Sequence, residues 1–363
     1  MAGKAGTGQQ HPTLHSHLRA VITSKKHTQL CNSVIPTLID GISEIAKALR
    51  ASQKVSLAGS ANAFGDDQLN VDVLAEDIIR DAIAKCPSVV TASSEEDPVE
   101  RPARREESSS RGDAEEQYTV AFDPLDGSSI IAPNWAVGTI IGIWEGSTAL
   151  RQPPAGKQVA AILGVFGPRA VAVVAVRVPG SEGVCFEVGL SEDGKNRDAE
   201  ILRPSIRFAG PPFKSRYFAP ANLRAAAEDE QYMALVMHLI QNKYTLRYSG
   251  GLVPDVVHAL VKGHGIYISP VTDKSKAKLR RLFELFPLAL IVECAGGLAI
   301  DPVDGSNILD RQLEDINERA GLRLEQSGLV LWHFVAECSE LDEGGNYGVI
   351  FSSQVSSAKP PFD

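Results

Sequence analysis

Residues 121–129 read AFDPLDGSS, and the fold has to be built around them. Thr119 and Val120 precede them and begin an apolar run, so Asp123 and Asp126 are expected where a buried strand ends. Asp, Pro, Gly and Ser also make up ordinary turns. An ordinary turn has no need of two acids, so the segment favours a functional role.

The residues that follow the two acids supply hydrogen-bond donors: Gly127, Ser128 and Ser129. Backbone N–H groups and hydroxyls at the start of a helix hold an anion. The neighbouring carboxylates suit a hard cation such as Mg²⁺, which prefers oxygen ligands. The segment therefore predicts a place where a cation and a phosphate meet.

Length and charge limit the class of protein. The chain has 363 residues, of which 44% are hydrophobic, and this is enough for a large core divided between two lobes. The net charge is −9 and no long basic run occurs, so neither a nucleic-acid partner nor a membrane-surface partner is predicted. The acidic excess fits a cation binder better.

The cysteines and the apolar segments bear on the compartment. The five cysteines are dispersed and lack C-x-x-C spacing, so neither a disulfide framework nor a zinc site is indicated. No apolar run reaches the roughly 18 residues of a membrane-spanning helix, and the first 18 residues lack the apolar core of a signal peptide. A cytoplasmic protein is the expectation.

Helical and extended patterns alternate along the chain. Residues 33–50 and 71–85 carry apolar side chains at helical spacing, which predicts two amphipathic helices against a sheet. The Val-rich and Ile-rich segments 119–123, 136–144, 159–167 and 170–178 predict consecutive strands. Residues 97–117 contain almost no large apolar side chains and are expected to form a mobile loop. Helical patterns at 227–244, 251–263 and 280–297 indicate a second α/β lobe.

Further carboxylates accompany the two aspartates. Glu95 and Glu96 follow the short apolar segment SVVTAS, and Asp72 and Asp77 lie on the second predicted helix. Clustered carboxylates repel one another unless cations neutralise them, so the set makes sense with two or more metal ions. Each acid alone also has an ordinary interpretation, as a solvated loop charge or as part of the wet face of a helix.

The segment FDPLDGSS resembles the signature of the lithium-sensitive, metal-dependent sugar phosphatase superfamily, in the form found in the fructose-1,6-bisphosphatase family. Residues 64–77, 93–97, 136–146, 164–176, 244–256 and 276–297 are also similar to that family. The resemblance extends over roughly residues 40–312. It implies an α/β fold in α-β-α-β-α layers, with two α/β lobes and the active site between them.

The resemblance also implies roles for individual residues. The implied metal ligands are Glu95, Glu96, Asp123, Leu125, Asp126 and Glu284. The implied catalytic residues are Asp72, which also matches the family's metal-ligand acids, and the pair Asp77 and Glu96, which would help to activate the attacking water. The implied phosphate and sugar contacts are Gly127, Ser128, Ser129, Asn222, Arg247, Tyr248, Lys278 and Arg280. Lys278 and Arg280 have a second interpretation as surface charges of a helix.

The activity implied by the resemblance is hydrolysis of the 1-phosphate of a sugar bisphosphate, with two or three Mg²⁺ ions per active site and Mn²⁺ as a substitute. The segments TLRYSGGLVPDV and AKLRRLFE are more similar to the sedoheptulose enzymes of the family than to its fructose enzymes. Sedoheptulose 1,7-bisphosphate, cleaved to sedoheptulose 7-phosphate and phosphate, is therefore the first expectation. Fructose 1,6-bisphosphate, or a catalytically silent relative that binds sugar phosphates, is the alternative. A homodimer or homotetramer is implied as well.

The predicted organisation has three parts. Residues 1–32 form a partly flexible N-terminal extension, residues 33–210 a lobe for the metals and the 1-phosphate, and residues 211–363 a lobe for the sugar and the distal phosphate. Residues 347–358 resemble the family's final strand, which implies an insertion over 321–346. The insertion is either a surface elaboration or an error in the gene model.

Some family features are missing. Residues 55–60 lack the cysteine pair of a thiol switch, and the first 30 residues lack the family's AMP-binding element. The segment 266–270 reads IYISP, without the tyrosine that the fructose enzymes place near its end.

Overall fold

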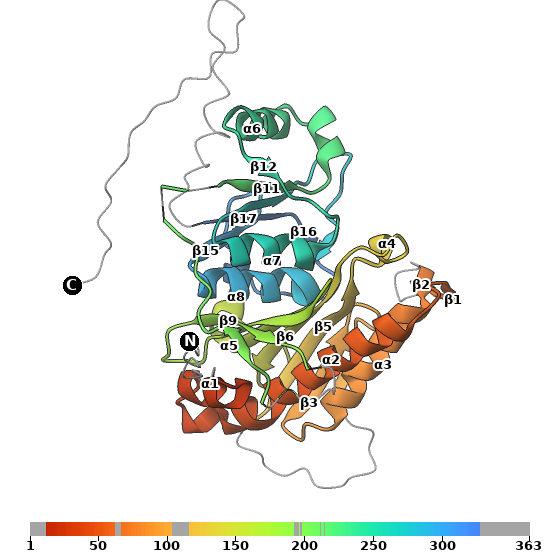
Figure 1. Ribbon diagram of the computed structural model, residues 1–363, viewed down its shortest axis with the longest axis vertical. Helices are drawn as coiled ribbons and strands as arrows, with labels where there is room; N and C mark the ends of the chain where they lie inside the picture. The colour runs from red at the N-terminus through yellow and green to blue at the C-terminus, as the bar shows by residue number, and fades with distance from the viewer. Residues whose placement is uncertain are drawn as a thin grey trace, which may run out of the picture.

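The computed structural model describes residues 12–61, 67–103, 116–191, 196, 198–210, 212–213 and 215–326. Five layers alternate as helices, sheet, helices, sheet and helix (Figure 1). The predicted α-β-α-β-α architecture is confirmed. No helix within these ranges is both long and apolar enough to cross a membrane.

The larger sheet has eight strands in the order β10-β9-β8-β7-β6-β5-β3-β4. The strands are β3 (Val89–Ser94), β4 (Arg101–Pro102), β5 (Tyr118–Asp126), β6 (Val137–Glu145), β7 (Gln158–Phe166), β8 (Ala170–Val176), β9 (Val184–Gly189) and β10 (Ile201–Arg203). All neighbours pair antiparallel except β3 and β5, which are parallel. The central strands are buried on both faces, which explains their continuous apolar runs.

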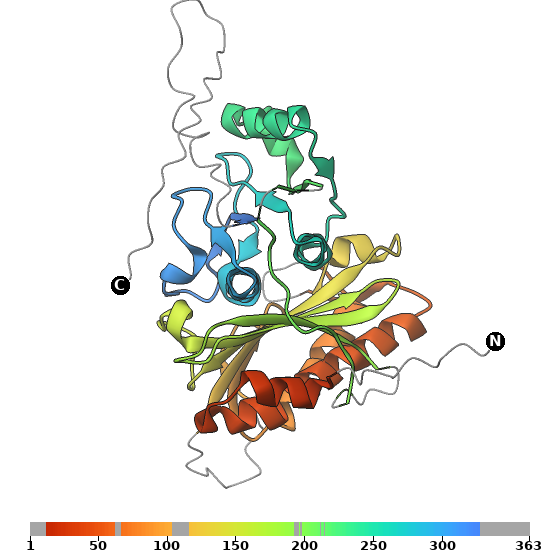
Figure 2. The same cartoon turned by 60° about the vertical axis from the view of Figure 1, so that its left-hand side comes forward.

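One face of this sheet is covered by α1 (Leu14–Val21), α2 (Ile35–Ala51) and α3 (Asn70–Ala84), as Figures 1 and 2 show. A π-helical turn, Leu30–Val34, leads into α2. Leu14 and Leu18 are fully buried in the same cluster as Ile35. The first lobe therefore begins before the expected boundary at residue 33, because α1 belongs to its core.

The second sheet has the order β12-β11-β13-β17-β15. Its strands are β11 (Tyr217–Pro220), β12 (Thr245–Leu246), β13 (Ile266–Ser269), β15 (Gly297–Ile300) and β17 (Leu322–Gln326). Helices α7 (Leu252–Lys262) and α8 (Phe286–Cys294) fill the layer between the two sheets, and α6 (Glu230–Gln241) lies on the outer face (Figure 2). Smaller elements are β1 (Leu57–Ala61), β2 (Asp67–Leu69), α4 (Ser128–Ile131), α5 (Pro154–Lys157), β14 (Leu279–Arg280) and β16 (Arg319–Ala320).

The predicted insertion over 321–346 is corrected at its start. Strand β17 lies between β13 and β15 and pairs antiparallel with both, so it is an interior strand of the second sheet. Leu322 and Leu324 are buried towards α7 and α8, while Arg323 and Glu325 form an ion pair of 3.0 Å on the other face. This alternation was readable in the sequence. The predicted final strand at 347–358 lies outside the described residues.

The predicted mobile loop over 97–117 is also corrected in part. Arg101 and Pro102 form β4 against β3, and the Arg101 guanidinium binds Asp97 at 2.6 Å. Backbone pairing and this ion pair order a segment that has few apolar side chains. Residues 104–115, which make up most of the loop, lie outside the described residues.

The two lobes approach closely because glycines line the contact. A Cβ atom on Gly138 of β6 would lie 2.5 Å from the Val253 Cβ of α7 and 2.8 Å from the Gly164 carbonyl oxygen. Contacts below 3.0 Å force a displacement. The absent side chain at Gly138 therefore sets how near the start of α7 comes to β5 and β6.

We predict that Gly138→Ala lowers the free energy of unfolding by about 1–3 kcal/mol, because the added methyl group overpacks a backbone contact. Urea denaturation measures the change. Gly156→Ala is the matched control, since a Cβ at Gly156 meets nothing within 4 Å. Equal stability of the two variants would show that α7 tolerates a wider separation from β6.

Candidate active site

The two aspartates of the FDPLDGSS segment point to the same face of β5. Residues three apart on a regular strand point to opposite faces. Asp123 pairs with Ile140 and Asp126 with Gly138, so three steps along β5 match two along β6. This bulge places one extra residue in β5 between the aspartates, so the alternation of side chains between the two faces shifts by one. Pro124, which lies between the aspartates, has no N–H group to donate to β6. Both carboxylates are thereby directed towards the second lobe.

Glu95 reaches the same place from the neighbouring strand. Strands β3 and β5 are parallel, so their carboxyl ends meet at one edge of the sheet. The Glu95 backbone N–H donates to the Phe122 carbonyl at 3.0 Å, which fixes the residue beside β5. Its side chain also hydrogen-bonds with Asp123. Two carboxyl groups in contact need a proton or a cation between them.

Glu284 completes the group from the second lobe. It lies in a π-helical turn, Arg281–Leu285, between β14 and α8, and its Oε2 accepts a hydrogen bond of 2.5 Å from the Arg280 N–H. Burial and then the charge of Glu95 raise the pKa of Glu284 well above its usual range. We call Glu95, Asp123, Asp126 and Glu284 the acidic cluster.

The acidic cluster is electrostatically strained. Burial, followed by the charges of Glu95 and Asp126, raises the pKa of Asp123 well above its ordinary value. Burial also raises the pKa of Asp126 to about 7, although this carboxylate accepts N–H bonds from Val253 at 2.7 Å and Leu252 at 3.3 Å. Backbone donors at the start of α7 therefore offset only part of the cost of burying the charge.

Arg280 forms an ion pair with this cluster. The contact with sugar or phosphate that the resemblance implies for Arg280 stays a prediction; its side chain is 2% exposed and its Nε lies 3.0 Å from Glu95 Oε1. Arg319, opposite Arg280 in the β14–β16 pair, also lowers the pKa of Glu95. No local motif in the sequence marked Arg319.

Asp72 lies beside the acidic cluster. Its Oδ2 accepts the Leu69 N–H at 2.9 Å at the start of α3, whereas Oδ1 is buried and has no hydrogen-bond partner. Burial, together with the charges of Glu96 and Glu95, raises the Asp72 pKa to about 6. A buried acceptor that faces two other carboxylates is suited to hold a proton or to bind a cation.

The structure does not bring Asp77 into this group. Five residues along a helix correspond to a rotation of about 140° from Asp72, and Asp77 is exposed. Glu76, four residues from Asp72, shares the Asp72 face and binds Ser94 Oγ at 2.8 Å and Arg80 Nε at 2.6 Å. Helical periodicity in the sequence would have favoured Glu76 over Asp77.

The predicted phosphate cradle follows directly after Asp126. Gly127 has φ +96°, a left-handed conformation that side chains disfavour, and the chain turns there into α4. Ser128 and Ser129 are exposed in the first turn of α4. The cradle is thus open to solvent at the edge of the acidic cluster.

The predicted sugar contacts lie in the second lobe. The Asn222 backbone N–H bonds the Tyr248 hydroxyl, and Tyr248 is 43% exposed. The Arg247 guanidinium lies over the Tyr217 ring, with 5.7 Å from its central carbon to the ring centroid. Lys278 is exposed at the entrance to β14. Asn222 and Tyr248 are therefore brought together, and both cationic side chains are accessible.

The donors fit a hard cation by chemistry, since all of them are carboxylate oxygens. Within the described ranges, no three His, Cys, Asp or Glu side chains are arranged as they stand to hold a metal ion. The carboxylates of the acidic cluster nevertheless lie close together, because they shift one another's pKa values. The geometry agrees with both facts because Arg280 and backbone N–H groups take up carboxylate oxygens that a metal would use.

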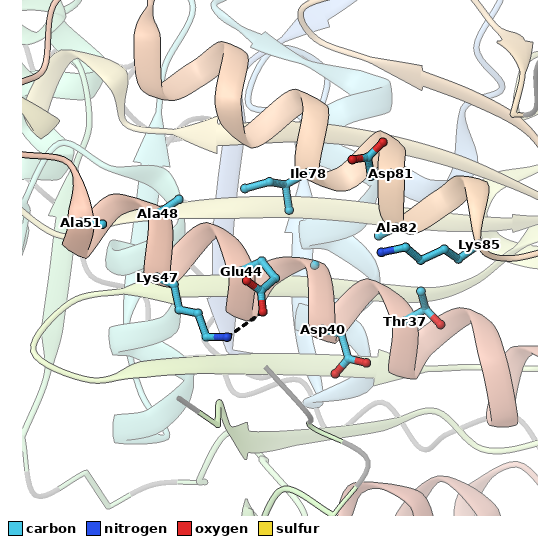
Figure 3. A pocket seen from close by; sticks show the side chains of 11 residues that line it. Thr37, Asp40, Glu44, Lys47, Ala48, Ala51, Ile78, Asp81, Ala82 and Lys85 are labelled. Atoms are coloured by element: carbon cyan, nitrogen blue, oxygen red, sulfur yellow. Dashed lines mark hydrogen bonds and ion pairs between the residues drawn. The ribbon is translucent and has the colours of Figure 1, made fainter. Parts of the chain in front are cut away.

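A separate hollow of about 650 Å³ lies between α2 and α3 (Figure 3). Its lining mixes acids and lysines, and Glu44 pairs with Lys47 at 2.7 Å. None of the predicted site residues lines it. We therefore place the candidate active site at the acidic cluster and not in this hollow.

Comparison with known proteins agrees with this architecture. Residues 18–192 match the N-terminal domain of fructose-1,6-bisphosphatase, and residues 212–330 match its C-terminal domain. The chain belongs to the fructose-1,6-bisphosphatase family. Members of this family are sugar bisphosphatases, which are phosphoric monoester hydrolases.

Individual relatives include enzymes for two substrates. The chain is 40% identical over 267 residues to the chloroplastic sedoheptulose-1,7-bisphosphatase of Triticum aestivum, covering 73% of this chain and 63% of that protein. It is 34% identical over 330 residues to a class 1 fructose-1,6-bisphosphatase of Citrifermentans bemidjiense, covering 88% and 90%. The match thus spans less than two thirds of the length of the Triticum relative.

Solved structures give the same result. A Toxoplasma gondii protein provisionally assigned as a sedoheptulose-1,7 bisphosphatase is 33% identical, with a TM-score of 0.74 over 87% of this chain and 95% of that one. Leishmania major fructose-1,6-bisphosphatase in its holo form is 26% identical, with a TM-score of 0.71 over the same shares. The layered fold is therefore that of the family.

The raised pKa values predict a pH-dependent response to metal. Asp72 and Asp126 have an ordinary pKa of 3.8, raised to about 6 and about 7 in the fold. Below these values the folded protein holds protons that a cation must displace, so binding strengthens as the pH rises. A fixed Mg²⁺ concentration should raise the free energy of unfolding more at about pH 8 than at about pH 5.5.

Urea denaturation with Mg²⁺ and with EDTA at both pH values measures this difference. At each pH, the free energy of unfolding in EDTA is subtracted from that in Mg²⁺. This subtraction removes the contribution of histidines and of acids far from the site. A stabilisation by Mg²⁺ that is equal at both pH values would mean that no buried carboxyl proton is displaced.

Proposed function

We propose that the chain is a metal-dependent sugar bisphosphatase that cleaves the 1-phosphate of sedoheptulose 1,7-bisphosphate, giving sedoheptulose 7-phosphate and phosphate. The observation that carries the proposal is the acidic cluster, which draws buried carboxylates from both lobes to the edge of the Gly127–Ser129 turn. Fructose 1,6-bisphosphate is the alternative substrate, as the class 1 relatives indicate.

The acidic cluster would hold Mg²⁺, with Mn²⁺ as a substitute and two or three ions per site. Glu96 would join it, and Leu125 would contribute its backbone carbonyl, since its side chain has no ligand atom. Bound cations would supply positive charge that neutralises the phosphoryl oxygens in the transition state. Glu95 would first have to leave its ion pair with Arg280. The Arg280 guanidinium, displaced from Glu95, would then face the phosphoryl group.

Asp72 is suited to accept the proton of the attacking water. Its buried Oδ1 has no hydrogen-bond partner, and its pKa of about 6 leaves it mostly ionised at neutral pH. Glu96 is close enough to raise that pKa and would act with it. Asp77, which sequence similarity placed in this role, is exposed on another face of α3.

The remaining contacts divide between the ends of the substrate. Gly127, Ser128 and Ser129 would bind the 1-phosphate through N–H and hydroxyl donors. Arg247 and Lys278 are exposed cations that would grip the distal phosphate, with Asn222 and Tyr248 beside the sugar. Arg247 directly follows β12, an edge strand, so in the proposed homodimer or homotetramer it could serve a neighbouring copy.

Phosphate release from the two bisphosphates, with Mg²⁺ and with EDTA, tests the proposal. We predict turnover only with the metal, and a loss of more than about 100-fold in Asp123→Asn, because a lost ligand charge weakens the cation site. Asp81→Asn on the exposed side of α3 is the control. Substantial turnover by Asp123→Asn at saturating metal would overturn the assignment, and no turnover by the unaltered protein would favour a silent sugar-phosphate binder.

Substrate choice depends on the end of β13. A seven-carbon sugar needs room for one more CH–OH unit at the distal end. Ser269, the last residue of β13, has no phenolic hydroxyl to close that end, and Ile268 is packed under α6. One hydrogen-bonded group changes discrimination by about 1–3 kcal/mol. We therefore predict a kcat/KM preference of roughly 10- to 100-fold for the seven-carbon substrate.

Ser269→Tyr should narrow this preference by impairing the longer substrate. Ser147→Tyr, at an exposed turn of the first lobe, controls for the added ring. Steady-state kinetics with both bisphosphates measures the ratio. An unchanged ratio in Ser269→Tyr would mean that the distal phosphate binds elsewhere.

A further inference from the structure

Asp255, in the first turn of α7, holds the turn that precedes its helix. Its Oδ1 accepts the Ser249 N–H at 2.8 Å and its Oδ2 accepts the Gly250 N–H at 3.2 Å. The side chain is buried, and in the described part of the chain it forms no ion pair. Its carboxylate thus accepts two charge-assisted bonds from backbone N–H groups, and it also accepts one from the Ser249 hydroxyl.

The turn held in this way connects two predicted parts of the site. Arg247 and Tyr248 come immediately before Ser249, and Leu252 and Val253, whose N–H groups bind Asp126, come immediately after Gly251. Ser249 Oγ also accepts the Gly251 N–H at 3.3 Å. Within seven residues the chain passes from the proposed distal-phosphate contacts to the acidic cluster.

The turn is also packed against the phosphate cradle. Gly250 has φ +98°, and a Cβ there would lie 3.4 Å from Ile130 Cγ2. A Cβ on Gly251 would lie 3.1 Å from Ile130 Cδ1, and one on Gly127 would lie 3.3 Å from Ile130 Cγ1. Ile130 of α4 therefore packs between the Gly127 turn of one lobe and the Gly250 turn of the other.

We propose that Asp255 is a positioning residue for the distal half of the substrate: it fixes the Ser249–Gly251 turn, and with it the distance from Arg247 and Tyr248 to the phosphate cradle. The proposal rests on the proposed bisphosphatase function. Misplacement of binding groups by about 1 Å reduces turnover up to 100-fold. Replacing Asp255 should therefore lower kcat/KM for a substrate that must be bound at both ends.

The kinetic test compares a substrate that has a distal phosphate with one that lacks it. For Asp255→Ala we expect kcat/KM for fructose 1,6-bisphosphate to fall about 10- to 100-fold, mostly through KM, and kcat/KM for fructose 1-phosphate to fall less than about 3-fold. Asp255→Asn should lie between the unaltered protein and Asp255→Ala, because its amide oxygen can still accept one N–H. Asp229→Ala removes a carboxylate that caps α6 in the same lobe and is the control for general destabilisation.

Hydrogen exchange of the backbone amides tests positioning without reference to activity. The Ser249 and Gly250 amides should exchange at least about 10-fold faster in Asp255→Asn and Asp255→Ala than in Asp229→Ala. Unchanged exchange at these amides, or an equal loss on both substrates, would overturn the proposal. If the unaltered protein cleaves no sugar bisphosphate, the proposed function fails, and exchange at Ser249 and Gly250 alone decides whether Asp255 orders the turn.

Discussion

Repulsion between buried carboxylates is the constraint on which the rest of the structure depends. Asp123, Asp126 and Glu284 are buried beside the partly exposed Glu95, whose charge raises the pKa of all three. Such a group is unstable unless positive charge, a proton or N–H donors offset it. Arg280, the start of α7 and the backbone of β14 supply this compensation from the second lobe. Neither lobe could hold the four acids alone.

Three local features of the fold bring these acids together. A bulge in β5 turns two aspartates to one face, and the parallel pairing of β3 with β5 places Glu95 at their side. The bare backbone of Gly138, opposite Asp126, lets α7 come close enough for its N–H groups to reach the Asp126 carboxylate. The same closeness joins the two cores across α7 and α8. Function and lobe packing therefore share the same contacts.

Much of this arrangement could be predicted, because it depends on local sequence patterns. The strand, turn and glycine in FDPLDGSS fixed the end of β5, and apolar periodicity located α2, α3 and the strands of the large sheet. Periodicity also held information that similarity to the family obscured: Glu76 shares a helical face with Asp72, and the alternation in Leu322–Gln326 marks an interior strand. In both cases the physical pattern was the better guide.

Other features depend on contacts between segments far apart in the chain. Arg280 meets Glu95 across 185 residues, and Asp126 meets Val253 across 127, so no local pattern could have paired them. In the sequence, Asp255 is an acid within the predicted helix 251–263, and Arg319 lies outside every predicted helix and strand. Their importance follows from long-range packing, because α7 carries Asp255 between the two sheets and the β14–β16 pair places Arg319 opposite Arg280.

The most direct test of the central claim is anomalous X-ray diffraction from crystals of the full chain grown with Mn²⁺. The account predicts anomalous peaks bounded by Glu95, Asp123, Asp126 and Glu284, with the Arg280 guanidinium displaced from Glu95. Peaks confined to other parts of the molecule, or an Arg280–Glu95 ion pair that persists at saturating Mn²⁺, would contradict it.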